Sequence, residues 1–165
     1  DASKAAADSG TVSPHLSRFS SDPVYHRSDA RTPIMDLNTL QTVLMTPMEA
    51  LKINRNGDSH MTELSFTDDL RTLQWTSSGR LSARVGAAQR RIAVHDIEHV
   101  ATGYGTEVLR RMITSKGARA PRRETVLSII SSERSLDIAM HTAAERNQLV
   151  GAVRDLMAYS KMAAI

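Results

Sequence analysis

The pattern of hydrophobic and polar positions along the chain is mostly that of short β-strands. Between residues 48 and 75, two alternating runs flank Asn56-Gly57, a pair typical of a tight β-hairpin turn. A type I′ turn needs positive φ at both central residues, which asparagine and glycine adopt at low cost. We therefore expect a hairpin here, in which Leu51 on the first strand folds back towards Leu64 on the second.

A short amphipathic helix is expected before this hairpin, over residues 34–45. Its apolar residues recur at three- and four-residue spacing: Ile34, Leu37, Leu40, Val43 and Leu44. Its polar side carries no Lys or Arg, which favours a helix packed on the domain edge over one lying on a membrane. Thr46-Pro47-Met48-Glu49 also fits a capping box, but the hairpin that follows so closely favours a strand from Met48.

Further strands and a C-terminal helix complete the predicted fold. A third strand, opening on Trp75, is expected after the hairpin, and residues 81–91 are expected to form a strand and a loop with Gly86. Further strands are expected at residues 91–100, 126–131 and 136–140. The last two form a second hairpin. Thr142 and Glu145 have the spacing of a capping box, which opens an amphipathic helix over residues 143–160. Strands followed by one such helix predict a mainly β fold, an antiparallel sandwich or partly open barrel capped by that helix.

The 165 residues, with 41% apolar content, suit one domain preceded by a tail. Residues 1–33 show no sustained period and are rich in Ser, Ala, Asp and Arg, so we expect them to form a flexible tail. Charges cancel within this tail, and the net charge of +3 lies in the remainder. The domain is expected over residues 34–160, with a leading helix at 34–45, a capping helix at 142–160 and a short C-terminal tail at 161–165.

Removal of the N-terminal tail is expected to leave the thermal midpoint of the domain unchanged within error, because the tail has no compact apolar set to bury. Thermal unfolding of the full chain and of residues 34–165 measures this directly. A large drop in the shortened chain would show that the tail docks on the fold, as expected of a subunit in an assembly.

The composition excludes several classes of function. The chain has no cysteine, which excludes disulfides, thiolate catalysis and cysteine-ligated zinc, and favours an intracellular location. No apolar run approaches the roughly 20 residues of a membrane helix, so any membrane contact is expected to be peripheral. The sequence begins at Asp1 without an initiator methionine, and we expect a fragment or a processed product.

Four stretches in order resemble those of a pleckstrin homology (PH) domain, most of all the one at the start of delta-class phosphoinositide-specific phospholipase C. They are LQTVL leading into ALKIN, TDDLRTLQW, HDIEHVATGYGTEVL and RSLDIAMHTAAERNQLVGAV. The resemblance covers residues 40–159. It implies a sandwich of about seven antiparallel strands closed by a C-terminal helix, as the pattern of elements also predicts. It also implies a non-catalytic module.

In that family the first hairpin presents Lys and Arg to inositol phosphates, whose charge needs several converging donors. Lys52 matches the first basic position of the family motif, whereas Asn54 and Thr62 stand where two further cations are expected. The resemblance therefore implies a partly degenerate phosphate site, supplemented from the turn and from the next loop. The candidate lipid-binding residues are Lys52, Arg55, Arg80 and Arg84.

A second basic feature, which we call the basic segment, spans residues 110–123 and contains no acidic residue. Its cations are Arg110, Arg111, Lys116, Arg119, Arg122 and Arg123. We expect a helical turn or strand end at residues 108–112 and a loop at 116–123. The segment is either a solvated loop or a contact for an anionic membrane, an acidic protein or RNA. RNA is least favoured, because no strand interleaves aromatic and basic residues.

One motif suggests an enzyme. His95-Asp-Ile-Glu98-His99 matches the H-x-x-E-H pattern of inverted zinc proteases. That chemistry needs both histidines on one face of a helix, together with a third ligand. The flanking residues alternate as a strand, so we expect neither metal catalysis nor any cofactor.

Two functions remain. In the first, the domain binds anionic phospholipid headgroups, such as phosphoinositides or phosphatidic acid, and brings its protein from the cytoplasm to a membrane surface. In the second, the degenerate fold is a protein-interaction or structural subunit of a larger assembly. We favour the first, which is the family's common use. Because two of three motif cations are absent, we expect a surface field to dominate, with Arg122 and Arg123 mattering as much as Lys52.

Overall fold

The computed structural model describes residues 33–77 and 90–163. Its helices are α1 (Leu37–Met45), α2 (Glu107–Lys116) and α3 (Ala143–Ala163), with short 3₁₀ turns η2 (Val94–Asp96), η3 (Gly117–Arg119) and η4 (Arg123–Thr125). Its strands are β1 (Met48–Ile53), β2 (Ser59–Phe66), β3 (Thr72–Ser77), β4 (Arg91–Ala93), β5 (Ile97–Thr102), β6 (Val126–Ser131) and β7 (Ser135–Ala139). The predicted mainly β fold with a C-terminal helix is confirmed.

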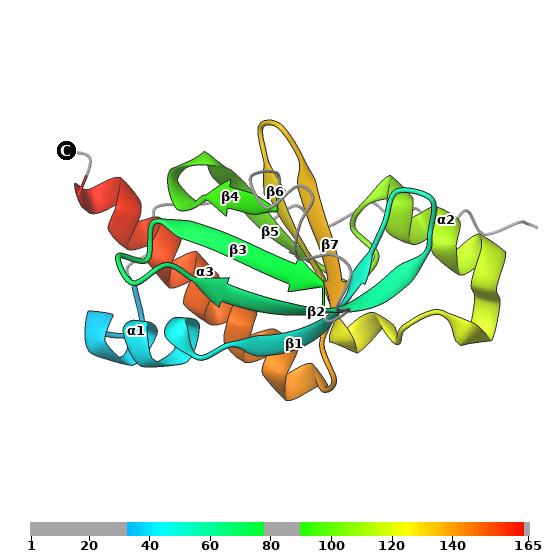
Figure 1. Cartoon of the computed structure of the whole chain (residues 1–165), viewed down its shortest axis with the longest axis horizontal. Helices are drawn as coiled ribbons and strands as arrows, with labels where there is room; N and C mark the ends of the chain where they lie inside the picture. Colours follow the sequence, from blue (N-terminus) through cyan, green and yellow to red (C-terminus); the bar gives the residue numbers. More distant parts are fainter. Residues whose placement is uncertain (1–32, 78–89, 164–165) are drawn as a thin grey trace, which may run out of the picture.

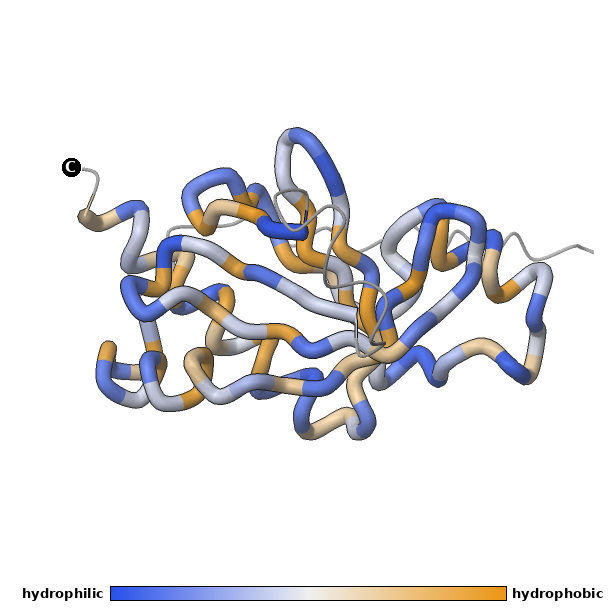
Figure 2. Tube along the Cα trace, in the orientation of Figure 1, coloured by the Kyte–Doolittle hydropathy of each residue, from blue (hydrophilic) through white to orange (hydrophobic). Residues whose placement is uncertain are grey.

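All seven strands are antiparallel and belong to one sheet, in the order β4-β3-β2-β1-β7-β6-β5. The sheet bends strongly, and α3 runs along its open side (Figure 1). The main core contains residues from α1, from the strands and from α3, among them Leu40, Leu64, Trp75, Ile129, Leu149 and Val153. Each fully buried aliphatic side chain contributes about 1.5–3 kcal/mol. Figure 2 shows hydrophobic segments along β6 and β7 and a hydrophilic β1–β2 turn.

The turn between β1 and β2 differs from the predicted type I′ turn. The Asn54 carbonyl accepts a hydrogen bond from the Gly57 N–H at 2.9 Å, and the Asn54 N–H donates to the Asp58 carbonyl at 2.7 Å. Only Gly57, at φ +84°, has a positive φ in this turn. The connection is therefore a three-residue loop, a turn closed by a left-handed glycine, and the prediction of positive φ at Asn56 is wrong.

This longer loop shifts the strand register by one residue, and a one-residue shift moves every side chain of a strand to the other face. Lys52 pairs with His60, whereas a two-residue loop would place Met61 opposite it. The expected approach of Leu51 to Leu64 is also wrong. Leu64 lies in the main core, and Leu51 packs with a smaller cluster beside α2. Lys52 lies on the same side of β1 as Met48 and Ala50, which face the main core.

The helix α2 covers residues 108–112, which were expected to form a helical turn or a strand end, and extends to Lys116. The segment expected as a loop at residues 116–123 follows it and contains η3 and the start of η4. Thr106 caps its start, because Thr106 Oγ1 accepts from the Leu109 N–H at 3.4 Å, and Gly117, at φ +52°, ends it. Its buried side joins a second core cluster made of Ile53, Leu109, Met112, Val126 and Ala139. Only two residues of α2 are fully buried, so the apolar pattern in the sequence was too short to predict a helix.

The N-terminal end of the described chain is tied to α3. Asp155 Oδ2 accepts the backbone N–H groups of Ile34 and Met35 at 3.0 and 2.8 Å. Asp36 then caps α1, which begins at Leu37 rather than at residue 34. From Met48 the chain is extended as β1, so the alternative capping box at residues 46–49 is wrong.

The capping box of α3 is present as predicted. The Thr142 N–H donates to Glu145 Oε2, and the Glu145 N–H donates to Thr142 Oγ1, both at 3.1 Å. α3 continues to Ala163, so residues 161–163, expected in the C-terminal tail, are helical. The strand expected over residues 91–100 is divided into β4 and β5 by η2. Most of the strand expected over residues 81–91 lies outside the described residues.

Candidate functional site

The end of the molecule formed by the β1–β2 turn and α2, which we call the hairpin end, holds most of the predicted site residues. Lys52 is half-buried on the core side of β1, next to Ile138 of β7. Its ammonium group donates from Nζ to Asn54 Oδ1 at 2.7 Å. Arg55 follows in the turn and is exposed. The two candidate cations of the hairpin therefore differ, because Lys52 is half-buried and held by a hydrogen bond, whereas Arg55 is exposed.

Burial is the largest cause that lowers the pKa of the Lys52 ammonium group below its ordinary range. The Asp137 carboxylate opposes this effect, and the cation of Arg90 adds to it. A desolvated ammonium group interacts more strongly with an anion than a hydrated one does. Lys52 is therefore suited to contact a phosphate group directly.

The buried carboxylate of Asp137 links the strands of the hairpin end to α2. Asp137 Oδ1 accepts from Ser128 Oγ at 2.6 Å and from Thr106 Oγ1 at 2.8 Å. Since Thr106 is the N-cap of α2, Asp137 joins β7 to the start of that helix. A carboxylate near a helix N-terminus is also favoured by the helix dipole.

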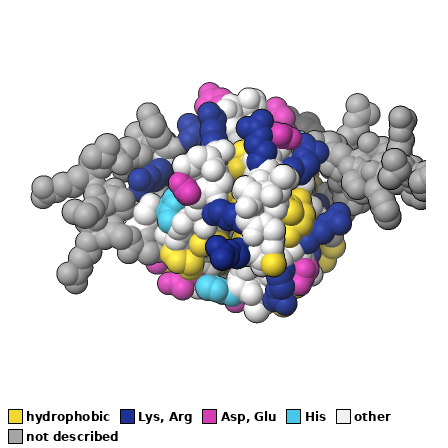
Figure 3. Space-filling model, turned by 90° about the vertical axis from the view of Figure 1, so that its right-hand side faces the viewer, with side chains coloured by type: hydrophobic (Ala, Val, Ile, Leu, Met, Phe, Trp, Pro, Cys, Tyr) yellow, Lys and Arg dark blue, Asp and Glu magenta, His cyan; other side chains and the backbone are white. Residues whose placement is uncertain are grey.

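The cations of the basic segment lie on the exposed side of α2 and in the turns after it. Glu107 Oε atoms lie 3.6 Å from Arg110 Nε and 2.9 Å from Arg111 Nε, and Glu124 Oε1 lies 3.5 Å from Arg122 Nε. Exposed pairs of this kind contribute only about 0–1 kcal/mol, so they leave the guanidinium groups available to an anionic partner. Lys116 ends α2, Arg119 lies in η3 and Arg123 begins η4. Figure 3 shows Lys and Arg spread over this end, with most acidic residues nearer its margin.

Solved structures provide the comparison with known proteins, since no family model and no curated protein matches the sequence. The PH domain from TgAPH aligns with a TM-score of 0.50 at 16% identity, covering 76% of this chain and 91% of that domain. Inner Membrane Complex Sub-compartment Protein 3 from Toxoplasma gondii aligns with a TM-score of 0.50 at 11% identity, covering 75% and 84%. PLC21 from S. officinalis aligns with a TM-score of 0.52 at 8% identity, covering 77% and 16%.

The chain has the pleckstrin homology fold. The resemblance drawn from the sequence is confirmed at this level, and it includes a similarity to a phospholipase C structure. A fold alone does not determine function, so the function of this PH fold depends on the chemistry of the residues at the hairpin end.

Two of the predicted lipid-binding residues, Arg80 and Arg84, lie outside the described residues. Thr62, where the family resemblance places a cation, is fully buried, and its hydroxyl donates to the Thr76 carbonyl at 2.7 Å. Thr62 therefore holds β2 to β3 and takes no part in the exposed surface of the PH fold.

The H-x-x-E-H motif does not form the helix that an inverted zinc protease requires. His95 lies in η2 and His99 on β5, so the two rings do not share one helical face. Within residues 33–77 and 90–163, no group of three or more potential metal ligands comes together. Over the same residues, no helix is long and apolar enough to cross a membrane.

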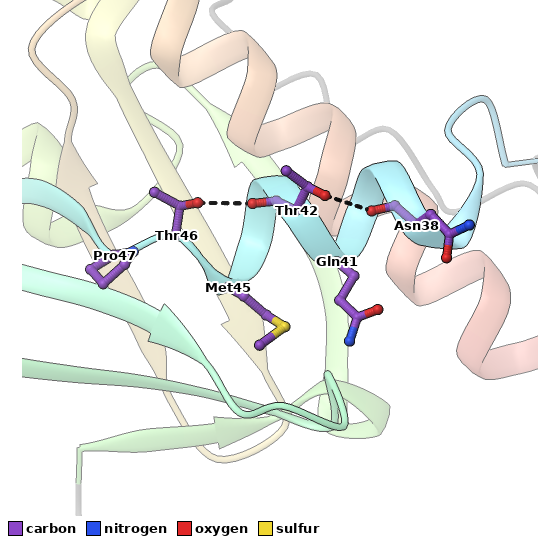
Figure 4. Close-up of a pocket in the computed structure, with 6 residues that line it drawn as sticks. All are labelled: Asn38, Gln41, Thr42, Met45, Thr46 and Pro47. Atoms are coloured by element: carbon purple, nitrogen blue, oxygen red, sulfur yellow. Dashed lines mark hydrogen bonds between the residues drawn. The ribbon is translucent and has the colours of Figure 1, made fainter.

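A second surface feature lies on α1, at the opposite end of the PH fold. It is an open hollow of about 610 Å³, lined by Asn38, Gln41, Thr42, Met45, Thr46 and Pro47 (Figure 4). None of these side chains is charged, and two exposed apolar residues, Ile34 and Leu37, lie on or just before the same helix. A phosphate group would find no cation among these six residues.

Sequence reasoning missed two residues beside Lys52, namely His60 and Arg90. His60 is the cross-strand partner of Lys52, and Arg90 acts on both through its charge. Counting strand pairs from a three-residue loop would have placed His60 opposite Lys52, because loop length sets the hairpin register. No local signal in the sequence places Arg90 near the hairpin.

Proposed function

We propose that this PH-fold chain is a non-catalytic module that binds anionic phospholipid headgroups, such as phosphoinositides or phosphatidic acid. Binding would hold its protein at the cytoplasmic surface of a membrane. The observation that carries the proposal is the gathering of half-buried Lys52, exposed Arg55 and the basic side of α2 at one end of the molecule (Figures 1 and 3). Phosphate groups need several such donors.

The residues of the hairpin end divide into two kinds by their surroundings. Lys52 is positioned and desolvated, so its charge-assisted hydrogen bond to a phosphate group is worth about 1.5–3 kcal/mol. The exposed cations of α2 contribute attraction of about 1 kcal/mol each near an anionic surface, screened by salt. Direct contact and surface field therefore act together, and only the first distinguishes one headgroup from another.

Co-sedimentation with phosphatidylcholine vesicles, with and without phosphoinositide or phosphatidic acid, tests the proposal. We expect binding only when the anionic lipid is present, weakening steadily as salt is raised because the field of α2 is screened. Binding that ignores lipid composition, or no binding at low salt, would contradict lipid recognition and favour the second function.

That second function is a protein-interaction or structural module of an assembly, and the hollow on α1 favours it. The hollow is uncharged and lies beside exposed Ile34 and Leu37. A surface that carries no charge and adjoins exposed apolar side chains fits a protein partner better than a lipid headgroup. The two functions use opposite ends of the fold and are separable by substitution at either end.

A further inference from the structure

Three side chains at the hairpin end form a connected row. Lys52 Nζ donates to Asn54 Oδ1 at 2.7 Å, and Asn54 Nδ2 lies 3.4 Å from His60 Nδ1. An ammonium group has donors and no acceptor, so it fixes the Asn54 amide with its oxygen towards Lys52 and its nitrogen towards His60. His60 Nδ1 then faces a donor, and it must accept that bond. The row in this state requires a neutral imidazole.

The charges that act on His60 are positive. They belong to Lys52 on β1 and to Arg90 before β4, and the one acid acting on this group of residues, Asp137 on β7, acts on Lys52. Burial, followed by these two cations, lowers the pKa of His60 below the ordinary value of 6.5. A neutral histidine on which two cations act takes up a proton more readily once an anion offsets their charge.

We propose that Lys52, Asn54 and His60 form a proton-coupled anion site that binds a phosphate group. The phosphate draws the Lys52 ammonium group away from Asn54, and His60 takes up one proton from solvent. The Asn54 amide then turns, so that Oδ1 accepts a hydrogen bond from protonated Nδ1. No other co-reactant is needed, since a single proton moves and no covalent bond to carbon or phosphorus changes. This inference rests on the proposed lipid-binding function and adds proton regulation to its site.

His60 thereby provides the cation on β2 that the family resemblance places at Thr62. A positively charged His60 opposite Lys52 gives a phosphate group two converging donors on neighbouring strands. The site has both of its cations only when His60 is protonated. Asn54 is a positioning residue, because its amide turns when the anion binds. The apparent loss of motif cations is thus partly offset by a residue whose charge depends on pH.

Linkage fixes the direction of the pH dependence. Without an anion, the folded chain binds fewer protons at His60 than the unfolded chain, so stability at this site falls as the pH falls below 6.5. With an anion bound, the folded chain binds more protons at His60 than it does without the anion. Affinity for the anion therefore rises as the pH falls, by at most about tenfold per pH unit for one proton.

The wild-type chain tests the coupling by NMR titration of its histidine rings in chloride and in sulfate at equal ionic strength. Sulfate replaces phosphate because it does not titrate near neutral pH. We expect sulfate to raise the pKa of His60 by about one unit, and the ring signals of exposed His95 serve as the control within the same sample. In Asn54→Ala the rise should be smaller. A His60 pKa that stays constant while sulfate binds would overturn the inference.

Vesicles distinguish a lipid headgroup from free phosphate as the source of the anion. Phosphoinositide vesicles should bind the wild type more tightly as the pH falls, by roughly tenfold in total for a one-unit rise in the pKa of His60. His60→Gln should bind the same vesicles without this pH-dependent gain. His95→Gln, away from the row, should keep the wild-type profile. Equal pH dependence in wild type and His60→Gln would contradict the inference but leave lipid binding intact. A sulfate-coupled His60 without any vesicle binding would instead support a soluble phosphate ligand and contradict the proposed function.

Discussion

Replacing Asp137 with alanine is expected to lower the free energy of unfolding by about 3 kcal/mol and the thermal midpoint by roughly 10 °C. Asp137 is only 4% exposed, and its Oδ1 accepts from the hydroxyl groups of Ser128 and Thr106 at 2.6 and 2.8 Å. Hydrogen bonds to a charged group are worth about 1.5–3 kcal/mol each. Their loss leaves two hydroxyl groups without the acceptor they now share. Chemical denaturation measures the change.

The matched control is Glu133→Ala, which removes one negative charge at the exposed tip of the same β6–β7 hairpin. It should change stability by less than about 0.5 kcal/mol. Because Asp137 also holds the N-cap of α2, amide exchange in α2 should speed up in Asp137→Ala more than exchange in α3. A loss below about 1 kcal/mol, or exchange in α2 that stays at the wild-type rate, would contradict the role of Asp137.

Asp155→Ala is expected to cost about 2–3 kcal/mol, because it releases the start of the domain from α3. Asp155 is 1% exposed and accepts two backbone N–H groups, those of Ile34 and Met35. Tyr159 adds a hydrogen bond from its hydroxyl to the Met35 carbonyl at 3.0 Å. With the carboxylate gone, the segment that leads into α1 loses its strongest attachment. Thermal and chemical unfolding measure the loss.

Two further variants separate the charge from the attachment. Asp155→Asn keeps one oxygen for the two N–H groups and should cost less than Asp155→Ala. Tyr159→Phe should cost about 1 kcal/mol, the worth of one neutral hydrogen bond. If Asp155→Ala and Tyr159→Phe cost the same, the carboxylate is not the main anchor. The attachment also fixes where a truncation belongs, since a cut after Ile34 would remove one of its two donors.

The parts of the fold that short-range signals specify were predictable. The capping box of Thr142 and Glu145 and the hairpin of β6 and β7 depend on neighbouring residues, and the structure has both. The order of the elements was enough to indicate the sandwich and its closing helix. α2 was not predictable in the same way, because its stability comes from Asp137 and a small core cluster contributed by distant strands.

The candidate site was half predictable, for a reason of register. Lys52 and Arg55 follow from the hairpin and the family resemblance, and both lie at the hairpin end. If the turn is taken as type I′, the predicted pairing is shifted by one residue. Met61 is then predicted opposite Lys52, and the true partner, His60, is missed. Turn geometry depends on whether Asn56 adopts a positive φ, and residue preference alone does not decide that.

Lipid binding by the hairpin end is tested most directly by comparing a double variant, Lys52→Ala with Arg55→Ala, against Arg71→Ala on phosphoinositide vesicles. Arg71 is the matched control, since its side chain is 85% exposed in the β2–β3 loop, at the end of the strands opposite the β1–β2 turn (Figure 1). Loss of one direct contact worth about 1.5–3 kcal/mol predicts at least roughly tenfold weaker binding of the double variant. We expect Arg71→Ala to bind as the wild type does. Equal weakening in both variants, or no binding above that to neutral vesicles, would contradict the assignment of the site.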